Sequence, residues 1–171
     1  MTDPFALLRQ GETDVLACWL PVREPDLVAS APAFRESLTV AVPVRHPLAA
    51  RASVELSDLT RDAVVRVAGS AAPHYWTSAV SPEFTSDGRP IPDGPSAETL
   101  MEALAFASVG QGLVLVAEHV ARAVPRPDLS YVPVSDAPTL EWGLVWPRAA
   151  ETARVRSFVD AVRSAFRRSA H

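Results

Sequence analysis

Lysine is absent from this sequence: its sixteen basic residues are all arginine, and twenty acidic residues outnumber them. The formal net charge is −4 and the pI is near 5.5. The exclusive use of arginine indicates a GC-rich genome rather than a binding surface. Because modules that bind nucleic acid usually carry a basic patch, this balance argues against direct DNA binding by the chain.

Cysteine and metal-ligand patterns are also scarce. Cys18 is the only cysteine, and it lies within the apolar run of residues 15–20. A single thiol in such a run is typical of a small buried hydrophobe, and it excludes a disulfide framework or a zinc site built on cysteines. No histidines, cysteines and carboxylates are spaced like metal ligands, so we expect no metal and no cofactor.

Long apolar runs are missing as well. No stretch approaches the roughly 18 apolar residues of a membrane helix. Residues 1–5 lack the charged and then apolar pattern of a signal peptide. We therefore expect a soluble, cytoplasmic protein that does not associate with membranes.

The 171 residues that are present, 48% of them hydrophobic, suffice for one domain or two small lobes with a buried core. Residues 14–20 form a continuous apolar run, which predicts a strand buried on both faces. Further strands are predicted at residues 27–31, 37–44, 64–68, 113–116, 131–134 and 142–146. Short apolar strands that alternate with helices predict an α/β fold with a largely parallel sheet.

Helices are predicted where capping residues frame a periodic apolar stripe. The clearest runs over residues 96–109, with Ser96 as its N-cap and Gly110 after its end. Others are predicted at residues 4–10 and 152–168, with helical turns at 57–60 and 118–123. Residues 69–95 are rich in Gly, Pro, Ser and Asp, and they predict a long loop that is either functional or mobile.

Several short motifs follow one another in a fixed order. They are LRQGETDV (8–15), LTVAVP (38–43) with HPLA (46–49), VELSDL (54–59), VGQGL (109–113), YVPVSD (131–136), EWGLVW (141–146) and RVRSFV (154–159). In this order and spacing they resemble the sensing domain of LysR-type transcriptional regulators. The resemblance covers nearly the whole chain.

The resemblance implies a two-lobed, periplasmic-binding-protein-like α/β fold. Residues 1–33 with 141–171 would form a first-lobe remnant, and residues 34–140 a complete second lobe. The family's helix-turn-helix and linker helix are not in this sequence, nor are the strand, helix and second strand that normally open the sensing domain. The first lobe is therefore expected to be incomplete.

The family's cleft between lobes is the expected ligand site. Ligands of parallel α/β sheets bind beyond the carboxyl ends of strands, which selects the loops after Leu20 and Ala68 and the turn at 110–112. The candidate ligand-binding residues are Trp19, Pro21, Val22, Gly69, Ser70, His74, Trp76, Gly110 and Gln111. Several of these have a structural alternative: core packing for the tryptophans, loop capping for Ser70 and a surface position for His74. For Gly110-Gln111-Gly112 the alternative is a tight helix-to-strand turn, since no Lys-Ser/Thr follows.

No catalytic residues are assigned. Glu118 and His119 are adjacent on a short helical turn, so their side chains should diverge, and His46 beside Pro47 reads as structural. The sequence therefore predicts an effector-binding domain that binds a small metabolite without its own DNA-binding module.

Two other functions remain open. A free-standing domain of this kind could have been recruited as an enzyme on a secondary metabolite, such as a cyclase or hydrolase. It could also be a dominant-negative partner that dimerises with intact regulators. We further expect a homodimer through the first-lobe remnant (Phe5, Leu7, Leu8, Val15) or the closing helix, because an incomplete lobe leaves an exposed sheet edge.

Overall fold

The computed structural model describes residues 3–67 and 72–169. The chain forms two compact units, which we call the inserted unit (Ser37–Thr139) and the terminal unit (Asp3–Glu36 with Leu140–His171). Each contains strands and helices, so the predicted α/β class is confirmed. The candidate residues Gly69 and Ser70 lie outside the described residues.

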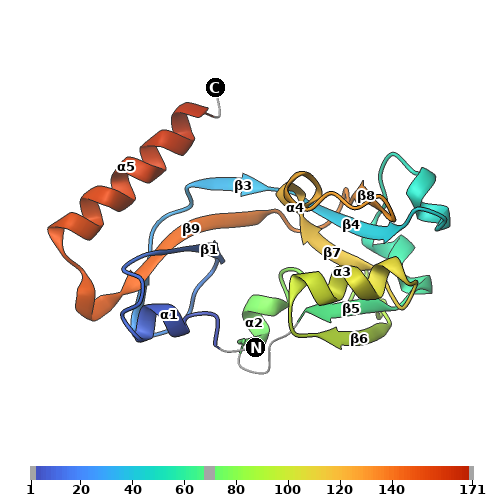
Figure 1. The fold of residues 1–171 in the computed structure, drawn as a ribbon, viewed down its shortest axis with the longest axis horizontal. Coiled ribbons are helices and arrows are strands. Elements are labelled where there is room, and N and C mark those ends of the chain that lie inside the picture. Colours follow the sequence, from blue (N-terminus) through green and yellow to red (C-terminus); the bar gives the residue numbers. More distant parts are fainter. Residues whose placement is uncertain (1–2, 68–71, 170–171) are drawn as a thin grey trace. The chain divides into compact units, whose positions relative to one another are not determined.

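A four-stranded antiparallel sheet forms the terminal unit (Figure 1). Its centre is β9 (Leu140–Pro147), which pairs with β1 (Leu16–Leu20) on one side and with β2 (Leu27–Ala29) and β3 (Phe34–Glu36) on the other. The register sets Cys18 opposite Gly143 and Phe34 opposite Trp142. Two distant segments of the chain are thereby joined into one sheet.

The strand β1 is less buried than its sequence predicts. Within Leu16–Leu20 only Cys18 is fully buried, and Ala17 is exposed. The prediction of a strand buried on both faces is wrong because β1 lies at the edge of its sheet, where fewer neighbours cover it. Cys18 itself is the small buried hydrophobe that was expected.

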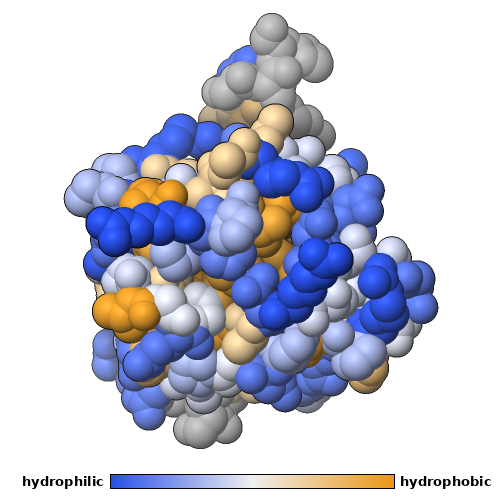
Figure 2. Space-filling model, turned by 90° about the vertical axis from the view of Figure 1, so that its right-hand side faces the viewer, coloured by the Kyte–Doolittle hydropathy of each residue, from blue (hydrophilic) through white to orange (hydrophobic). Residues whose placement is uncertain are grey.

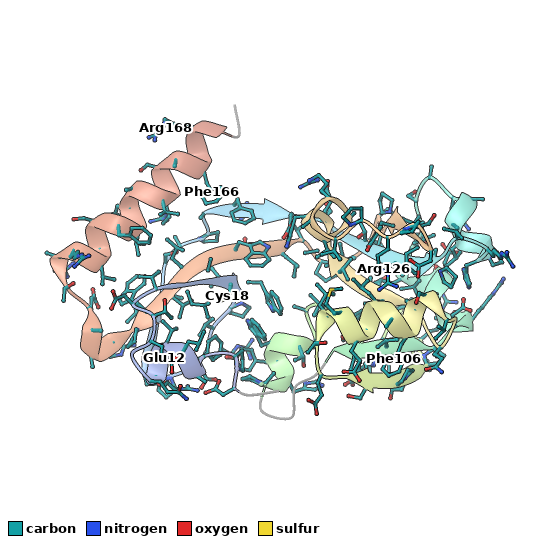
Figure 3. The ribbon with its side chains drawn as sticks, in the orientation of Figure 1. Glu12, Cys18, Phe106, Arg126, Phe166 and Arg168 are labelled. Atoms are coloured by element: carbon teal, nitrogen blue, oxygen red, sulfur yellow. The ribbon has the colours of Figure 1, made fainter. Side chains whose placement is uncertain are left out.

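Two helices accompany this sheet. The short α1 (Ala6–Arg9) is one turn of the predicted segment 4–10, and Arg9 binds the carboxylates of Asp3, Glu24 and Asp26. The closing α5 (Ala153–Ser169) is amphipathic as predicted, and its Val155 and Val159 are buried against Leu144 and Trp146. Further along α5, Phe166 lies beside β3 (Figure 3).

The inserted unit is built on β4 (Leu38–Pro43), which lies between β7 (Val114–Ala117) and β8 (Leu129–Pro133). Both pairings are antiparallel. Among the described strands only β5 (Val64–Val67) and β6 (Asp93–Ala97) pair in parallel, and isolated parallel bridges join Val64 to Leu113 and Val54 to Val134. The expected largely parallel sheet is therefore wrong. An apolar run indicates that a strand is buried on both faces, but it does not indicate the direction of the neighbouring strands. The strand β4 is buried on both faces and lies between antiparallel neighbours.

Helices and turns complete this unit. The main helix α3 (Leu100–Ser108) buries Ala103, Leu104 and Ala107, and it packs against β4, β5 and β6. The helices α2 (His74–Thr77) and α4 (Glu118–Ala123) are short, and 3-10 turns occupy Pro47–Ala50 and Leu56–Arg61. Figure 2 shows that the face drawn there is mostly hydrophilic, with small and separated apolar patches.

The predicted loop at residues 69–95 contains regular structure in its described part. It includes α2 and the start of β6, with Trp76 and Ile91 buried as anchors. The expected helix start at Ser96 is also wrong, because Ser96 lies in β6 and the N-cap is Thr99, whose hydroxyl accepts from Glu102 N at 3.1 Å. The sequence Asp-Gly-Pro-Ser-Ala has little strand propensity, so pairing with β5 overrides it.

Neither a membrane-spanning helix nor a cluster of metal ligands occurs among the described residues. Among residues 3–67 and 72–169, no helix has the length and apolar character to span a bilayer. The same residues contain no group of three or more His, Cys, Asp or Glu side chains placed to hold a metal ion.

Candidate functional site

The inserted unit has a polar pocket beside its parallel strands, which we call the β5–β6 pocket. Its volume is about 340 Å³. The walls come from β5, α2, the segment that follows α2, and β6. The lining residues are Arg66, His74, Thr77, Ser78, Ser81, Glu83, Asp93, Gly94 and Ser96. Apart from Gly94, every one of them has a polar side chain.

Arg66 is the cation of this pocket and is largely fixed by its neighbours. Its Nε donates to Asp93 Oδ1 at 2.6 Å, and its Nη1 donates to the carbonyls of Ser81 and Pro82 at 2.9 and 2.8 Å. The guanidinium thus ties the segment after α2 to both strands. Since the side chain is only 15% exposed while Asp93 is 77% exposed, the pair presents its positive end inward.

Ser81 places a buried hydroxyl at the same pocket. The residue is 7% exposed, and its Oγ has no hydrogen-bond partner among the described residues. A buried hydroxyl without a partner costs about 1–3 kcal/mol. A ligand that hydrogen-bonds to Ser81 would recover that cost, so this hydroxyl is a candidate recognition group of the pocket.

An exposed acid–base pair lies at the rim. His74 Nε2 is 2.8 Å from Glu83 Oε1, and the two side chains are 76% and 52% exposed. The neighbouring hydroxyls already donate hydrogen bonds to the backbone: Thr77 Oγ1 donates to the His74 carbonyl and Ser78 Oγ donates to the Tyr75 carbonyl. The rim therefore offers a titratable pair that reaches solvent.

The candidate residues predicted from sequence are distributed over the whole chain. His74 lines the β5–β6 pocket, and Trp76 two residues later is buried at 8% exposure. Trp19 is half-buried and packs edge-on against Trp142, with ring centroids 5.8 Å apart. Pro21, which follows a cis peptide bond, is exposed, and Val22 is half-buried.

Gly110 and Gln111 form a turn at the end of α3 rather than an open anion cradle. Their backbone N–H groups donate to the carbonyls of Ala107 and Phe106 at 3.0 and 2.9 Å. Gly110 has φ +76°, which favours glycine. Gly112 has φ +155°, and a Cβ there would lie 3.0 Å from the Ala63 carbonyl oxygen. These contacts and angles are those of a tight turn, the structural alternative given for these residues.

Arg66, Ser81 and Asp93 were not predicted from sequence. Arg66 did carry a signal, because it is the one charge within the apolar run Val64-Val65-Arg66-Val67. A charge in such a run is costly to bury unless it is paired, so it marks a site with a specific partner. Ser81 and Asp93 carried no comparable signal, since polar residues are common in segments of that composition.

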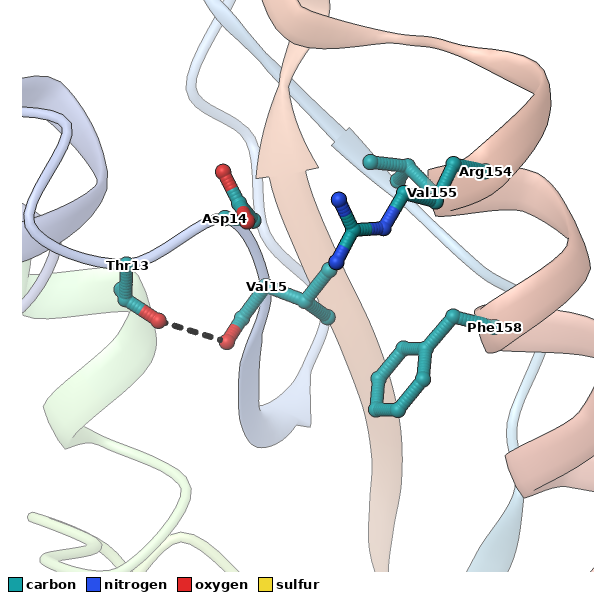
Figure 4. A pocket seen from close by; sticks show the side chains of 6 residues that line it. All are labelled: Thr13, Asp14, Val15, Arg154, Val155 and Phe158. Atoms are coloured by element: carbon teal, nitrogen blue, oxygen red, sulfur yellow. Dashed lines mark hydrogen bonds between the residues drawn. The ribbon is translucent and has the colours of Figure 1, made fainter.

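A second pocket lies in the terminal unit, with a volume of about 300 Å³. In Figure 4 the α5 residues Arg154 and Phe158 face the segment Thr13–Val15, within which Thr13 Oγ1 donates to the Val15 carbonyl at 3.1 Å. Phe158 is 53% exposed. Val15, Val155 and Phe158 give this pocket apolar walls, whereas the β5–β6 pocket contains the largely buried Arg66 and the Ser81 hydroxyl, which has no partner among the described residues.

Comparison with protein families places the chain among known domains. A family model described as the LysR substrate binding domain matches residues 1–167. No curated protein sequence matches the chain.

Solved structures share the fold at low sequence identity. The BenM effector binding domain with its effector benzoate aligns with TM-score 0.74 and 23% identity over 96% of this chain and 74% of that one. An OxyR mutant from Corynebacterium glutamicum aligns with TM-score 0.72 and 22% identity over 97% and 52%. Full-length CbnR complexed with its target DNA aligns with TM-score 0.76 and 18% identity over 94% and 56%.

These alignments confirm the predicted periplasmic-binding-protein-like fold. They also show how much of a related protein's length the chain covers. A full-length BenM mutant aligns with TM-score 0.75 and 22% identity, and the chain spans 55% of its length.

Proposed function

The chain belongs to the LysR substrate binding domain family, and on that premise we propose that it binds a small-molecule effector and performs no chemistry on it. The observation that carries the proposal is Ser81, a buried hydroxyl without a partner among the described residues, in the wall of a polar pocket. A volume of about 340 Å³ also falls within the roughly 300–1,000 Å³ typical of small-molecule sites.

The chemistry of the pocket favours a small polar metabolite. Ser81 can donate to or accept from the ligand, while Arg66 holds this wall in place through Asp93 and the carbonyls of Ser81 and Pro82. His74 is the residue predicted from sequence that we place at this site. The roles of Trp19, Pro21, Val22, Trp76, Gly110 and Gln111 stay predictions, as do those of Gly69 and Ser70.

We also propose that the chain has two lobes. Residues 1–33 with 141–171 form the first, and residues 34–140 form the second. The two compact units support this division, since the chain passes between them at residues 36–37 and 139–140. We further propose a homodimer and no direct DNA binding by this chain. The net charge of −4 supports the latter.

One observation favours the enzyme alternative. His74 and Glu83 form a close pair at the rim, as a general base and its orienting carboxylate would. Against this, the hydroxyls of Thr77 and Ser78 donate to backbone carbonyls and not to the imidazole. The pair therefore has no activated nucleophile among the described residues, and binding remains the better-supported function.

The test is a ligand screen that follows both binding and turnover. The chain is titrated calorimetrically with aromatic and aliphatic organic acids, including benzoate, and each mixture is analysed for product. We expect at least one saturable ligand that is recovered unchanged. A panel without any binder would contradict the proposal, and conversion of a bound compound would favour the enzyme.

A matched pair of variants then locates the site. Ser81→Ala should weaken binding about tenfold, as expected for the loss of one hydrogen bond to the ligand. Thr39→Val is the control, because Thr39 Oγ1 is likewise buried and unpartnered among the described residues but lies in β4, away from the lining of the pocket. Equal affinity in both variants would move the site away from the β5–β6 pocket.

A further inference from the structure

A smaller pocket in the terminal unit lies between β9 and α5, and we call it the β9–α5 pocket. Its volume is about 190 Å³. Four lining residues follow the spacing i, i+3, i+4 and i+7, so they share one face of α5. These are Arg156, Val159, Asp160 and Arg163; the other lining residues are Ser30, Trp146 and Glu151.

Two buried donors of this pocket lack an acceptor. Trp146 is only 6% exposed, and its Nε1 has no partner within the described part of the chain. The same holds for Nε of Arg163, whose side chain is 23% exposed. An indole and a guanidinium can donate hydrogen bonds but cannot accept them. The group that would satisfy both donors must therefore bring acceptor oxygens.

The carboxylates of the pocket do not meet this need. Arg156 Nη1 is 3.4 Å from Glu151 Oε1, and Arg163 Nη1 is 4.0 Å from Asp160 Oδ1. By contrast, Arg9 Nε approaches Asp26 Oδ2 to 2.8 Å in the same unit. Since charge-assisted hydrogen bonds measure about 2.7–2.9 Å, the two guanidiniums of the pocket keep donor capacity for another anion.

We propose that the β9–α5 pocket binds a small organic carboxylate. One carboxylate oxygen accepts from Trp146 Nε1 and the other from Arg163 Nε, while Arg156 approaches from the solvent side. The short alkyl part contacts Val159. The volume of about 190 Å³, against about 340 Å³ for the β5–β6 pocket, favours a ligand with only a few heavy atoms. The proposal is independent of the function assigned to that pocket.

The test follows the indole N–H directly. The full chain is labelled with ¹⁵N, and the Trp146 signal is assigned among the four tryptophans by its absence in Trp146→Phe. Butyrate is titrated at constant ionic strength, with butyramide and sulfate as parallel titrations. We expect butyrate to shift the Trp146 signal saturably, and butyramide and sulfate to leave it in place.

Two variants assign the donors. Arg163→Lys keeps the charge but removes Nε, and Trp146→Phe removes the N–H but keeps an aromatic ring; each should weaken butyrate binding at least about tenfold in calorimetry. Arg122→Lys, on the exposed side of α4, is the control and should bind as the original chain does. Arg163→Lys leaves the Trp146 signal readable, so it carries the test even if Trp146→Phe folds poorly.

Three results would overturn the proposal. The first is a Trp146 signal that butyrate does not shift saturably. The second is an equal shift with butyramide or sulfate. The third is unchanged butyrate affinity in Arg163→Lys.

Discussion

The ring of Phe34 stacks on the indole of Trp142, with centroids 5.7 Å apart and planes 6° from parallel. Phe166 of α5 stacks on Phe34 at 4.7 Å, and Trp19 meets Trp142 edge-on at 5.8 Å. One row of rings therefore crosses β1, β9 and β3 and ends on α5. These contacts connect the last turns of α5 with the sheet.

Truncation of Phe166 tests that connection. Phe166→Ala should destabilise the protein by about 1 kcal/mol, because an aromatic pair contributes roughly 0.5–1.5 kcal/mol beyond its buried area. The loss should be local, with faster hydrogen exchange in the last two turns of α5. Phe158→Ala is the matched control on the same helix, since Phe158 is similarly exposed, at 53% against 42% for Phe166, but stacks on no ring among the described residues. Equal exchange in both variants would contradict the prediction.

Ser81→Ala is expected to weaken ligand binding without lowering the stability of the ligand-free protein. Without ligand it removes a buried hydroxyl that has no partner among the described residues, so the free energy of unfolding should stay unchanged or rise by up to about 1 kcal/mol. Urea unfolding measures this directly. A loss of 2 kcal/mol or more, on the scale that the removal of a satisfied buried group produces, would indicate that Ser81 is already satisfied within the protein.

Acid should weaken the terminal unit through Asp26. The hydrogen bond from Arg9 lowers the pKa of Asp26 below its usual 3.8. A carboxyl whose folded-state pKa is lowered stabilises the protein above the unfolded-state pKa, and this contribution is lost as the pH falls through the folded-state pKa. Asp26→Asn should therefore reduce stability at pH 7 and flatten the decline below pH 4, as followed by thermal melts. Glu12→Gln, at an exposed position, is the control and should leave the melting temperature at pH 7 unchanged.

Cys18 should be inert in the folded protein. Burial raises the pKa of its thiol to about 12, so almost no thiolate is present near neutrality. An aromatic disulfide reagent at pH 8 should react with it only as fast as the protein unfolds, and immediately in 6 M guanidinium. Rapid native labelling would show that β1 opens far more readily than its pairing with β9 implies.

The sequence predicted well what depends on order and composition. The successive motifs led to the family fold, and apolar runs located β4, β5, β7, β8 and β9. Strand direction was not predictable in this way, because a strand such as β4 is equally apolar with parallel or antiparallel neighbours. The strand β6 was missed because its residues Asp93–Ala97 owe their conformation to β5 and not to their own propensity.

The candidate site was harder to predict from the sequence than the fold. His74 was predicted, but the polar wall around it depends on Arg66 reaching the backbone carbonyls of Ser81 and Pro82, fifteen and sixteen residues away. Contacts between side chains and backbone at that separation leave no periodic pattern in a sequence. Only the isolated charge of Arg66 within its apolar strand indicated that such a contact must exist.

Gly94 is a position of the β5–β6 pocket that cannot take a side chain without moving its neighbours. A Cβ at this position would lie 3.0 Å from both the carbonyl carbon and the oxygen of Val64, and backbone atoms cannot give way as a flexible side chain can. Any other residue would push the two strands apart. New ligand preferences in descendants of this protein are therefore expected to arise at exposed lining positions such as His74 and Glu83, while Gly94 itself is retained.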